Sequence, residues 1–180
     1  MSAGDRDLIL SRLPDPPAEA APPPGTLLAT ESVASWSRFE MELLKLGGRI
    51  VDLDESRAAL RTGAVIDDDV AAVLGVGADD DVVWDADVGA TTALCGVAET
   101  GSVLLEAGPG RNRMASLAPP LHIVFLRRSA LVATLEDAFK AMTRRTAVLI
   151  TGPSRTADIE GVLVRGVHGP RNLWVCPLDS

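Results

Sequence analysis

Polar side chains able to bind or transfer a charged group gather near the end of the chain. The stretch from Ala147 to Pro170 reads AVLITGPSRTADIEGVLVRGVHGP and begins as a short apolar run that is typical of a buried strand. The Gly-Pro turn that follows carries Ser154, Arg155 and Thr156. Two hydroxyls, a planar guanidinium and the N–H groups of a turn suit a carboxylate or a phosphate. The stretch therefore predicts a site for a small anion, with Asp158 included in the candidate binding set.

A purely structural interpretation of the same residues stays open. The hydroxyls of such a turn commonly bond nearby backbone N–H groups, and Arg155 has Asp158 and Glu160 within reach as salt-bridge partners. The spacing GxxxxGK[ST] of a nucleotide-binding P-loop is absent.

The chain has two histidines, and each has two interpretations. His168 lies between Val167 and Gly169-Pro170, and a role as general acid or base would require a carboxylate partner such as Asp158 or Glu160. The alternative is an imidazole that bonds backbone groups and holds the loop. His122 begins an apolar run, and there we favour the structural interpretation.

Composition limits the class of protein. A length of 180 residues suggests one domain, and a net charge of −8 argues against a general nucleic-acid binder. No apolar run is long enough to span a membrane. The first residues, MSAGDRDLILSRL, have no apolar signal-peptide core, so a cytoplasmic location is expected.

The cysteines predict neither a metal site nor a cofactor. Cys95 and Cys176 are the only two and form no CxxC pair, zinc set or iron–sulfur set. We expect two buried thiols. The acidic run Asp79–Asp81 lacks the spacing of an EF-hand and is interpreted as a solvated loop.

The N-terminal segment differs in composition from the remainder. Residues 14–24 read PDPPAEAAPPP, and this density of proline favours an extended linker over helix or central strand. We expect residues 1–25 to form an arm and residues 26–180 to form the domain. The arm either has no fixed structure or docks on another subunit, which leaves a homo-oligomer open.

Strands and helices are expected to alternate along the domain. Apolar periodicity and capping residues predict a helix ending near Leu46 and a second helix from Ser129 to Met142, while Thr91 or Thr92 would cap a helical turn. Expected strands are 49–53, 64–66, 82–84, 102–105, 121–126, 147–150 and 173–176. This alternation predicts an α/β fold with a mostly parallel sheet flanked by helices. Ligands of such sheets bind at the carboxyl ends of the strands, where we place the loop after Ile150.

Four short segments resemble a known family. They are Ala98–Ser102 (AETGS), Arg113–His122 (RMASLAPPLH), Gly152–Glu160 (GPSRTADIE) and Gly166–Pro170 (GVHGP), in this order. This combination is similar to the LUD-domain family, in particular its lactate-utilisation protein C (LutC/YkgG) branch. The resemblance covers roughly residues 30–178.

The resemblance implies a fold similar to the NagB/RpiA/CoA-transferase group. It also implies a role in a system that oxidises L-lactate to pyruvate with iron–sulfur partner subunits. Because this chain lacks cluster ligands, it looks like the cluster-free component, binding a small organic acid, the partner subunits, or both.

Glu99 is the candidate nucleophile that the related fold suggests. In CoA-transferases of this group a glutamate before a small turn carries the acyl group, and Glu99 precedes Thr100-Gly101. The alternative is a turn carboxylate that pairs with Arg113, which is itself a candidate for anion binding. Three hypotheses therefore remain: a subunit of a lactate-oxidising system, a stand-alone CoA-transferase-like or sugar-phosphate-isomerase-like enzyme using Glu99, and an organic-acid sensor. The sequence fits an enzyme and a binding protein alike.

Overall fold

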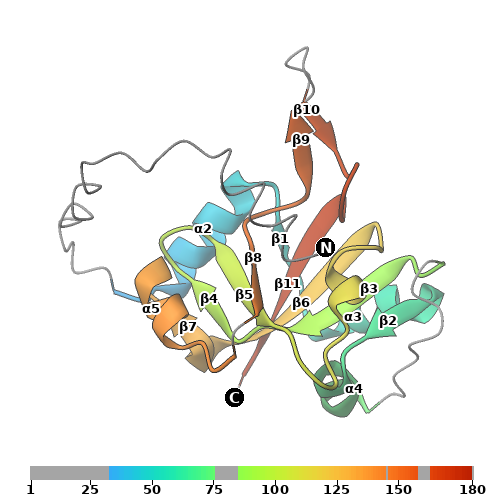
Figure 1. Cartoon of the computed structure of the whole chain (residues 1–180), viewed down its shortest axis with the longest axis horizontal. Helices are drawn as coiled ribbons and strands as arrows, with labels where there is room; N and C mark the ends of the chain where they lie inside the picture. Colours follow the sequence, from blue (N-terminus) through green and yellow to red (C-terminus); the bar gives the residue numbers. More distant parts are fainter. Residues whose placement is uncertain (1–32, 76–84, 145, 158–162, 180) are drawn as a thin grey trace, which may run out of the picture. The chain divides into compact units, whose positions relative to one another are not determined.

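A five-stranded parallel sheet forms the first layer of the fold (Figure 1). The computed structural model describes residues 33–75, 85–144, 146–157 and 163–179. The strand order is β1-β11-β6-β3-β2, and all four pairings are parallel. The strands are β1 (Arg49–Ile50), β2 (Ala64–Ile66), β3 (Val88–Thr92), β6 (Leu121–Arg127) and β11 (Asn172–Leu178). The α/β class with a mostly parallel sheet is confirmed.

A second sheet of four strands has the order β7-β4-β5-β8. Its central strand β5 is antiparallel to both neighbours, whereas β4 and β7 are parallel. These strands are β4 (Cys95–Val97), β5 (Ser102–Glu106), β7 (Leu131–Val132) and β8 (Ala147–Ile150). A separate antiparallel pair consists of β9 (Arg155–Ala157) and β10 (Leu163–Arg165).

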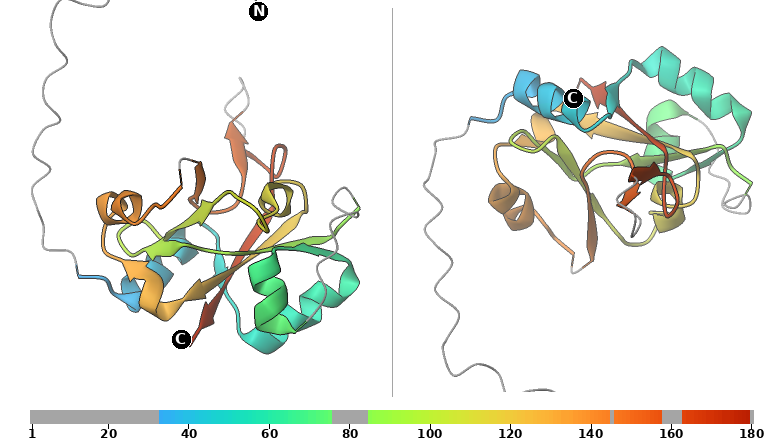
Figure 2. Two further views of the ribbon diagram at one scale, coloured as in Figure 1. Left: turned by 60° about the horizontal axis from the view of Figure 1, so that its bottom comes forward. Right: turned by 90° about the horizontal axis from the view of Figure 1, so that it is seen from above.

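Three of the α-helices cover the outer faces of the two sheets (Figure 2). The α-helices are α2 (Trp36–Lys45), α3 (Leu53–Ala59), α4 (Asp68–Leu74) and α5 (Leu135–Lys140), and the short 3₁₀ helices are η1 (Leu60–Thr62), η2 (Arg113–Ser116) and η3 (Arg128–Ala130). Residues of α3 and α4 pack on the outer face of the parallel sheet, and residues of α5 pack on the outer face of the second sheet. The inner faces of the two sheets pack against each other, together with α2.

Strand β6 shows how one strand serves two layers of the core. Because side chains alternate along a strand, Val124 and Leu126 face the second sheet and join Phe39 of α2. Ile123 and Phe125 point the other way, toward α3 and α4. All five side chains are completely buried, so β6 is a central support of the molecule.

The predicted helix from Ser129 to Met142 is confirmed only over Leu135–Lys140, and its expected first part is wrong. The chain instead forms η3, then β7, and starts α5 only after Thr134. Thr134 and Asp137 make a complete capping box, with the Asp137 N–H donating to Thr134 Oγ1 and the Asp137 carboxylate accepting from the Thr134 N–H. The helix is therefore capped at Thr134, five residues after the Ser129 cap that the apolar spacing indicated.

Two smaller expectations are also corrected. Thr91 and Thr92 do not cap a helical turn but lie in strand β3, which pairs with β6. The strand expected at 49–53 is limited to Arg49–Ile50, because Asp52 caps α3 by accepting from the Glu55 N–H at 2.7 Å. The arm (1–25), Asp79–Asp81 and the expected strand 82–84 lie outside the described residues. No helix within the described ranges is long and apolar enough to cross a membrane.

Gly89 of β3 supports a test of the packing between β3 and η2. A Cβ at this position would lie 1.7 Å from the carbonyl oxygen of Ala115, a backbone atom that cannot turn aside. We expect Gly89→Ala to lower the free energy of unfolding by about 2 kcal/mol or more. The matched control is Gly96→Ala in β4, whose Cβ would meet side-chain atoms of Leu126, Leu131 and Phe39. It should cost about 1 kcal/mol. Urea denaturation measures both, and equal losses would contradict the backbone contact.

Candidate functional site

A cavity of about 310 Å³, called the main cavity below, opens where β8 leaves the second sheet. Three of the four family-like segments contribute to its wall. The lining residues are Ser116, Leu117, His122, Leu149, Ile150, Thr151, Gly152, Pro153, Ser154, Arg155, His168, Gly169, Pro170 and Leu173. The fourth segment is attached to it, because Ser102 Oγ and Thr151 Oγ1 share a hydrogen bond of 2.8 Å.

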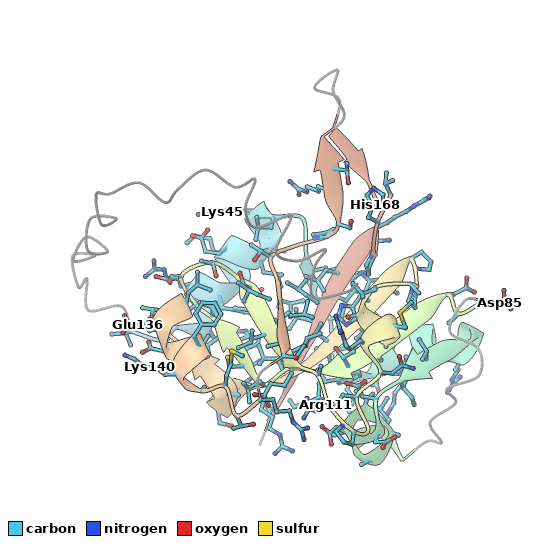
Figure 3. The ribbon with its side chains drawn as sticks, viewed as in Figure 1. Lys45, Asp85, Arg111, Glu136, Lys140 and His168 are labelled. Atoms are coloured by element: carbon cyan, nitrogen blue, oxygen red, sulfur yellow. The ribbon has the colours of Figure 1, made fainter. Side chains whose placement is uncertain are left out.

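Backbone hydrogen bonds hold the two polar loops of this wall together. The Ser154 N–H donates to the carbonyl of Pro170 at 2.9 Å, and the Gly166 N–H donates to the carbonyl of Ser154 at 3.0 Å. Gly152 and Gly166 have φ of 82° and 74°, so glycine permits both turns. The loops therefore bring Ser154 and His168 to one cavity although they are far apart in sequence. Figure 3 shows His168 beside β10.

Arg155 contributes the positive charge at the exposed side of the main cavity. Its Nη2 donates to the carbonyl of Leu46, the residue that ends α2. A cation is favoured at the C-terminus of a helix, where unpaired carbonyls concentrate negative potential. This anchor uses one guanidinium nitrogen, and the other guanidinium N–H groups have no hydrogen-bond partner among the described residues.

His122 forms the buried side of the main cavity. The sequence analysis favoured a purely structural role for this residue and did not include it in the candidate site. Its exposed fraction is 1%, and Nε2 lies 2.9 Å from Thr91 Oγ1. Nδ1 is buried and has no hydrogen-bond partner among the described residues. Leaving such an atom unpaired costs roughly 1–3 kcal/mol. Burial lowers the pKa of His122 to about 3, so the ring is neutral.

The main cavity lies at the opposite edge of the parallel sheet from the one predicted. His122 and Leu173 are the second residues of β6 and β11, so the cavity is at the amino ends of these strands. The prediction is wrong because β8 does not belong to the parallel sheet. It pairs antiparallel with β5 in the second sheet. A strand's periodicity does not reveal its partner.

A smaller second cavity, of about 20 Å³, adjoins the main cavity. Ser116 lines both, and the Thr91–His122 hydrogen bond joins a residue of one to a residue of the other. Arg113 lines the second cavity rather than the main one. Figure 3 shows Arg111, another residue of the second cavity, far from His168 in that view.

Two buried carboxyl groups of the second cavity have opposite pKa shifts. Burial raises the pKa of Asp67 to about 6, although the N–H of Asn112 donates to its Oδ1 at 2.7 Å. Burial also acts to raise the pKa of Glu106, but hydrogen bonds outweigh it and the pKa lies below its ordinary value. The N–H groups of Thr143 and Arg144 donate to Glu106 at 2.6 and 2.9 Å. Glu106 therefore anchors the segment before β8.

Two further candidate residues, Glu99 and Thr156, do not line the main cavity. Glu99 Oε1 accepts from the N–H of Leu135 at 2.8 Å, at the first turn of α5, and Glu99 does not line the cavity. Thr156 pairs with Val164 in the β9–β10 ladder, and Asp158 lies outside the described residues. The assignments of Glu99, Arg113, Thr156 and Asp158 to the site remain predictions.

Both thiols are buried, as the sequence indicated. Burial raises the pKa of Cys95 to about 11 and also raises the pKa of Cys176. Neither thiol is therefore a ready nucleophile at neutral pH. Within the described residues, no three His, Cys, Asp or Glu side chains come together as a metal site.

The sequence is similar to a known protein family and to several curated proteins. The family description LUD domain matches residues 79–176, just over half of the chain. "Lactate utilization protein C" of Shouchella clausii is 40% identical over 103 residues, and the same-named protein of Deinococcus radiodurans is 36% identical over 96 residues. An uncharacterised protein of Neisseria meningitidis is 37% identical over 95 residues. These alignments cover 53%, 50% and 49% of this chain, but only 45%, 45% and 41% of the relatives. The chain thus matches less than half the length of each.

One solved structure has the same fold. It is the crystal structure of a DUF162 family protein from Deinococcus radiodurans, with a TM-score of 0.60 and 22% sequence identity. The superposition covers 78% of this chain and 94% of that one.

Asp67 gives a pH-dependent test of the buried polar region. In the folded protein, the Asp67 carboxyl group keeps its proton up to about pH 6. In the unfolded chain it loses the proton near the reference pKa of 3.8. The folded state binds more protons in this window, so the contribution of Asp67 to the free energy of unfolding falls as the pH rises from about 4 to about 6. We expect the stability of wild type relative to Asp67→Asn to decline across that window and then level off. Urea denaturation at a series of pH values measures the difference, and parallel profiles would contradict the raised pKa.

Proposed function

The chain belongs to the LUD-domain family, and from this membership we propose that it is the cluster-free component of an L-lactate-utilisation system. In that role it binds a small organic anion in the main cavity and works with iron–sulfur partner subunits. The names of the relatives from Shouchella clausii and Deinococcus radiodurans support the assignment to lactate utilisation. With only two cysteines in the sequence, the chain has too few ligands for a Cys₄ cluster of its own.

One observation carries the binding part of the proposal. The described parts of the two most distinctive family-like segments, 152–157 and 166–170, meet through the Ser154–Pro170 and Gly166–Ser154 hydrogen bonds, and both contribute residues to the same cavity. Ser154, Arg155 and His168 offer a hydroxyl, a guanidinium and an imidazole to a carboxylate. Ile150 and Leu173 offer apolar surface to a short alkyl group. A volume of about 310 Å³ is at the small end for ligand pockets.

The position of Glu99 argues against the enzyme hypothesis, whereas the main cavity is compatible with an organic-acid sensor. A CoA-transferase-like or isomerase-like enzyme needs a free Glu99 carboxylate beside a substrate pocket, but Glu99 bonds the N–H of Leu135 and is not part of the main cavity. An organic-acid sensor would use the same cavity as the proposed subunit. It differs in needing no iron–sulfur partner.

Direct titration tests the anion site. L-Lactate or pyruvate should bind the 180-residue chain and raise its melting temperature by mass action. Arg155→Gln should weaken binding about tenfold or more, since hydrogen bonds to charged groups contribute about 1.5–3 kcal/mol. Ser154→Ala should weaken it about threefold to tenfold. Matched controls are Arg127→Gln and Ser129→Ala, two exposed residues at the opposite end of β6. Absence of binding at millimolar acid would remove the anion site from the proposal.

The cellular role has its own test. A strain that lacks the chain should fail to grow on L-lactate as sole carbon source but grow normally on pyruvate, because only the oxidation step is lost. A tagged wild-type chain should restore growth and co-purify with subunits that contain iron and acid-labile sulfide. Normal growth on L-lactate without the chain would contradict the role, whatever the titration shows.

A further inference from the structure

A cavity of about 450 Å³, called the edge cavity below, opens at the carboxyl ends of the parallel strands. Thr92, Arg127 and Leu178 line it, and they are the last residues of β3, β6 and β11. The main cavity lies at the amino ends of β6 and β11, and the two cavities share no lining residue. The edge cavity is therefore a separate candidate site, and it is the larger of the two.

The path of the chain explains why a cavity forms at this edge. After β2 the chain enters α4 on the outer face of the parallel sheet, whereas after β3 it enters β4 of the second sheet on the inner face (Figure 1). Because β2 and β3 are neighbours, their two connections diverge from adjacent positions. Ligands of open α/β sheets bind outside the carboxyl ends of the strands at such a point.

Two arginines and one carboxylate set the charge of the edge cavity. Arg111 lies next to α4 (Figure 3), where its Nη2 donates to the carboxylate of Asp69 at 2.7 Å. Its Nη1 donates to the carbonyl of Thr92 at 3.3 Å. Arg127 is exposed, and its guanidinium has no hydrogen bond or ion pair within the described ranges. The wall therefore has one more positive than negative charge.

Apolar side chains form most of the remaining wall. They come from α4, from the chain after β3, and from the ends of β6 and β11: Ala72, Val73, Ala93, Leu94, Ala130 and Leu178. Val73 has an exposed fraction of 36%, so an apolar group placed against it removes hydrophobic surface from water. A volume of about 450 Å³ leaves room for a body much larger than the methyl group of a three-carbon acid.

We propose that the edge cavity binds an amphipathic carboxylic acid, whose carboxylate pairs with Arg111 and Arg127 and whose apolar body covers Val73. The Arg111–Asp69 pair already shows a carboxylate on this guanidinium. The Asp69 side chain is 51% exposed, and exposed ion pairs contribute little stability, so Asp69 yields its place to a ligand at small cost. This site goes beyond the proposed function, because it shares no residue with the main cavity.

Calorimetric titration of the 180-residue chain with 2-naphthoate tests the edge site. Two matched probes separate the charge from the apolar body. The first, 2-naphthamide, has the same rings without the charge, and the second, acetate, has the charge without the rings. Wild type should bind 2-naphthoate at least about tenfold more tightly than either probe, because only 2-naphthoate uses both the arginines and the apolar wall.

Two substitutions of exposed residues should change this affinity in opposite directions. Arg127→Gln should weaken 2-naphthoate binding about tenfold, since it removes a charged hydrogen-bond donor. Asp69→Asn should strengthen binding about threefold, since it removes the carboxylate that competes for Arg111. A gain in affinity does not arise from poor folding. The matched control is Arg57→Gln on α3, an exposed arginine that does not line the edge cavity, and it should leave the affinity unchanged.

Binding of 2-naphthoate in the main cavity would give a different pattern. There Arg155→Gln, rather than Arg127→Gln, would weaken binding, and L-lactate would compete with the probe. That pattern would overturn the edge site, as would equal binding of 2-naphthoate and 2-naphthamide, unchanged affinity in Arg127→Gln and Asp69→Asn, or no binding at millimolar 2-naphthoate. A chain that binds 2-naphthoate at the edge but does not bind L-lactate would contradict the proposed function alone.

Discussion

The close contact of η2 with β3 is the constraint on which the site depends. The backbone of Ala115 lies so near Gly89 that any side chain there would collide with it. This contact fixes Ser116 between the two cavities and lets η2 cover the inner face of β3. Gly89 is also the register partner of His122 in β6. The contact that excludes a side chain at position 89 therefore lies one strand away from the buried His122.

Most of the buried polar groups beside this contact are paired, but Thr92 Oγ1 and His122 Nδ1 have no hydrogen-bond partner among the described residues. Glu106 has hydrogen bonds from Thr143 and Arg144, and Asp67 accepts from the N–H of Asn112. These pairings hold the loops that follow β2 and precede β8. His122 has a partner on one nitrogen only.

Much of the fold was predictable because its signals are local. The apolar runs at 64–66, 121–126 and 147–150 all form strands, and the helix before Gly47 forms as its spacing indicated. The predictions failed where the structure of a segment depends on a partner that is distant in sequence. Strand β8 lies in the second sheet rather than the parallel one, which moved the expected site to the wrong edge. The N-cap of α5, Thr134, is a local feature, but the apolar spacing before it favoured an earlier start of the helix.

The site was predictable in part for the same reason. The segments 152–160 and 166–170 stood out by residue type, and their convergence on one cavity follows from hydrogen bonds of the loops themselves. His122 did not stand out, because a histidine at the start of an apolar strand is commonly structural. Its partner Thr91 is 31 residues away. Only the pairing of β3 with β6 places the two side chains on one face.

The paired Thr91 and His122 side chains are poorly suited to act as a nucleophile and its base. A hydroxyl hydrogen-bonded to an imidazole has the outline of a nucleophile and its base. Here, however, the hydroxyl of Thr91 is buried, and burial holds the pKa of His122 near 3, so this ring is a weak base. In the proposed anion site, the charge that attracts an acid therefore comes from the exposed Arg155 rather than from His122.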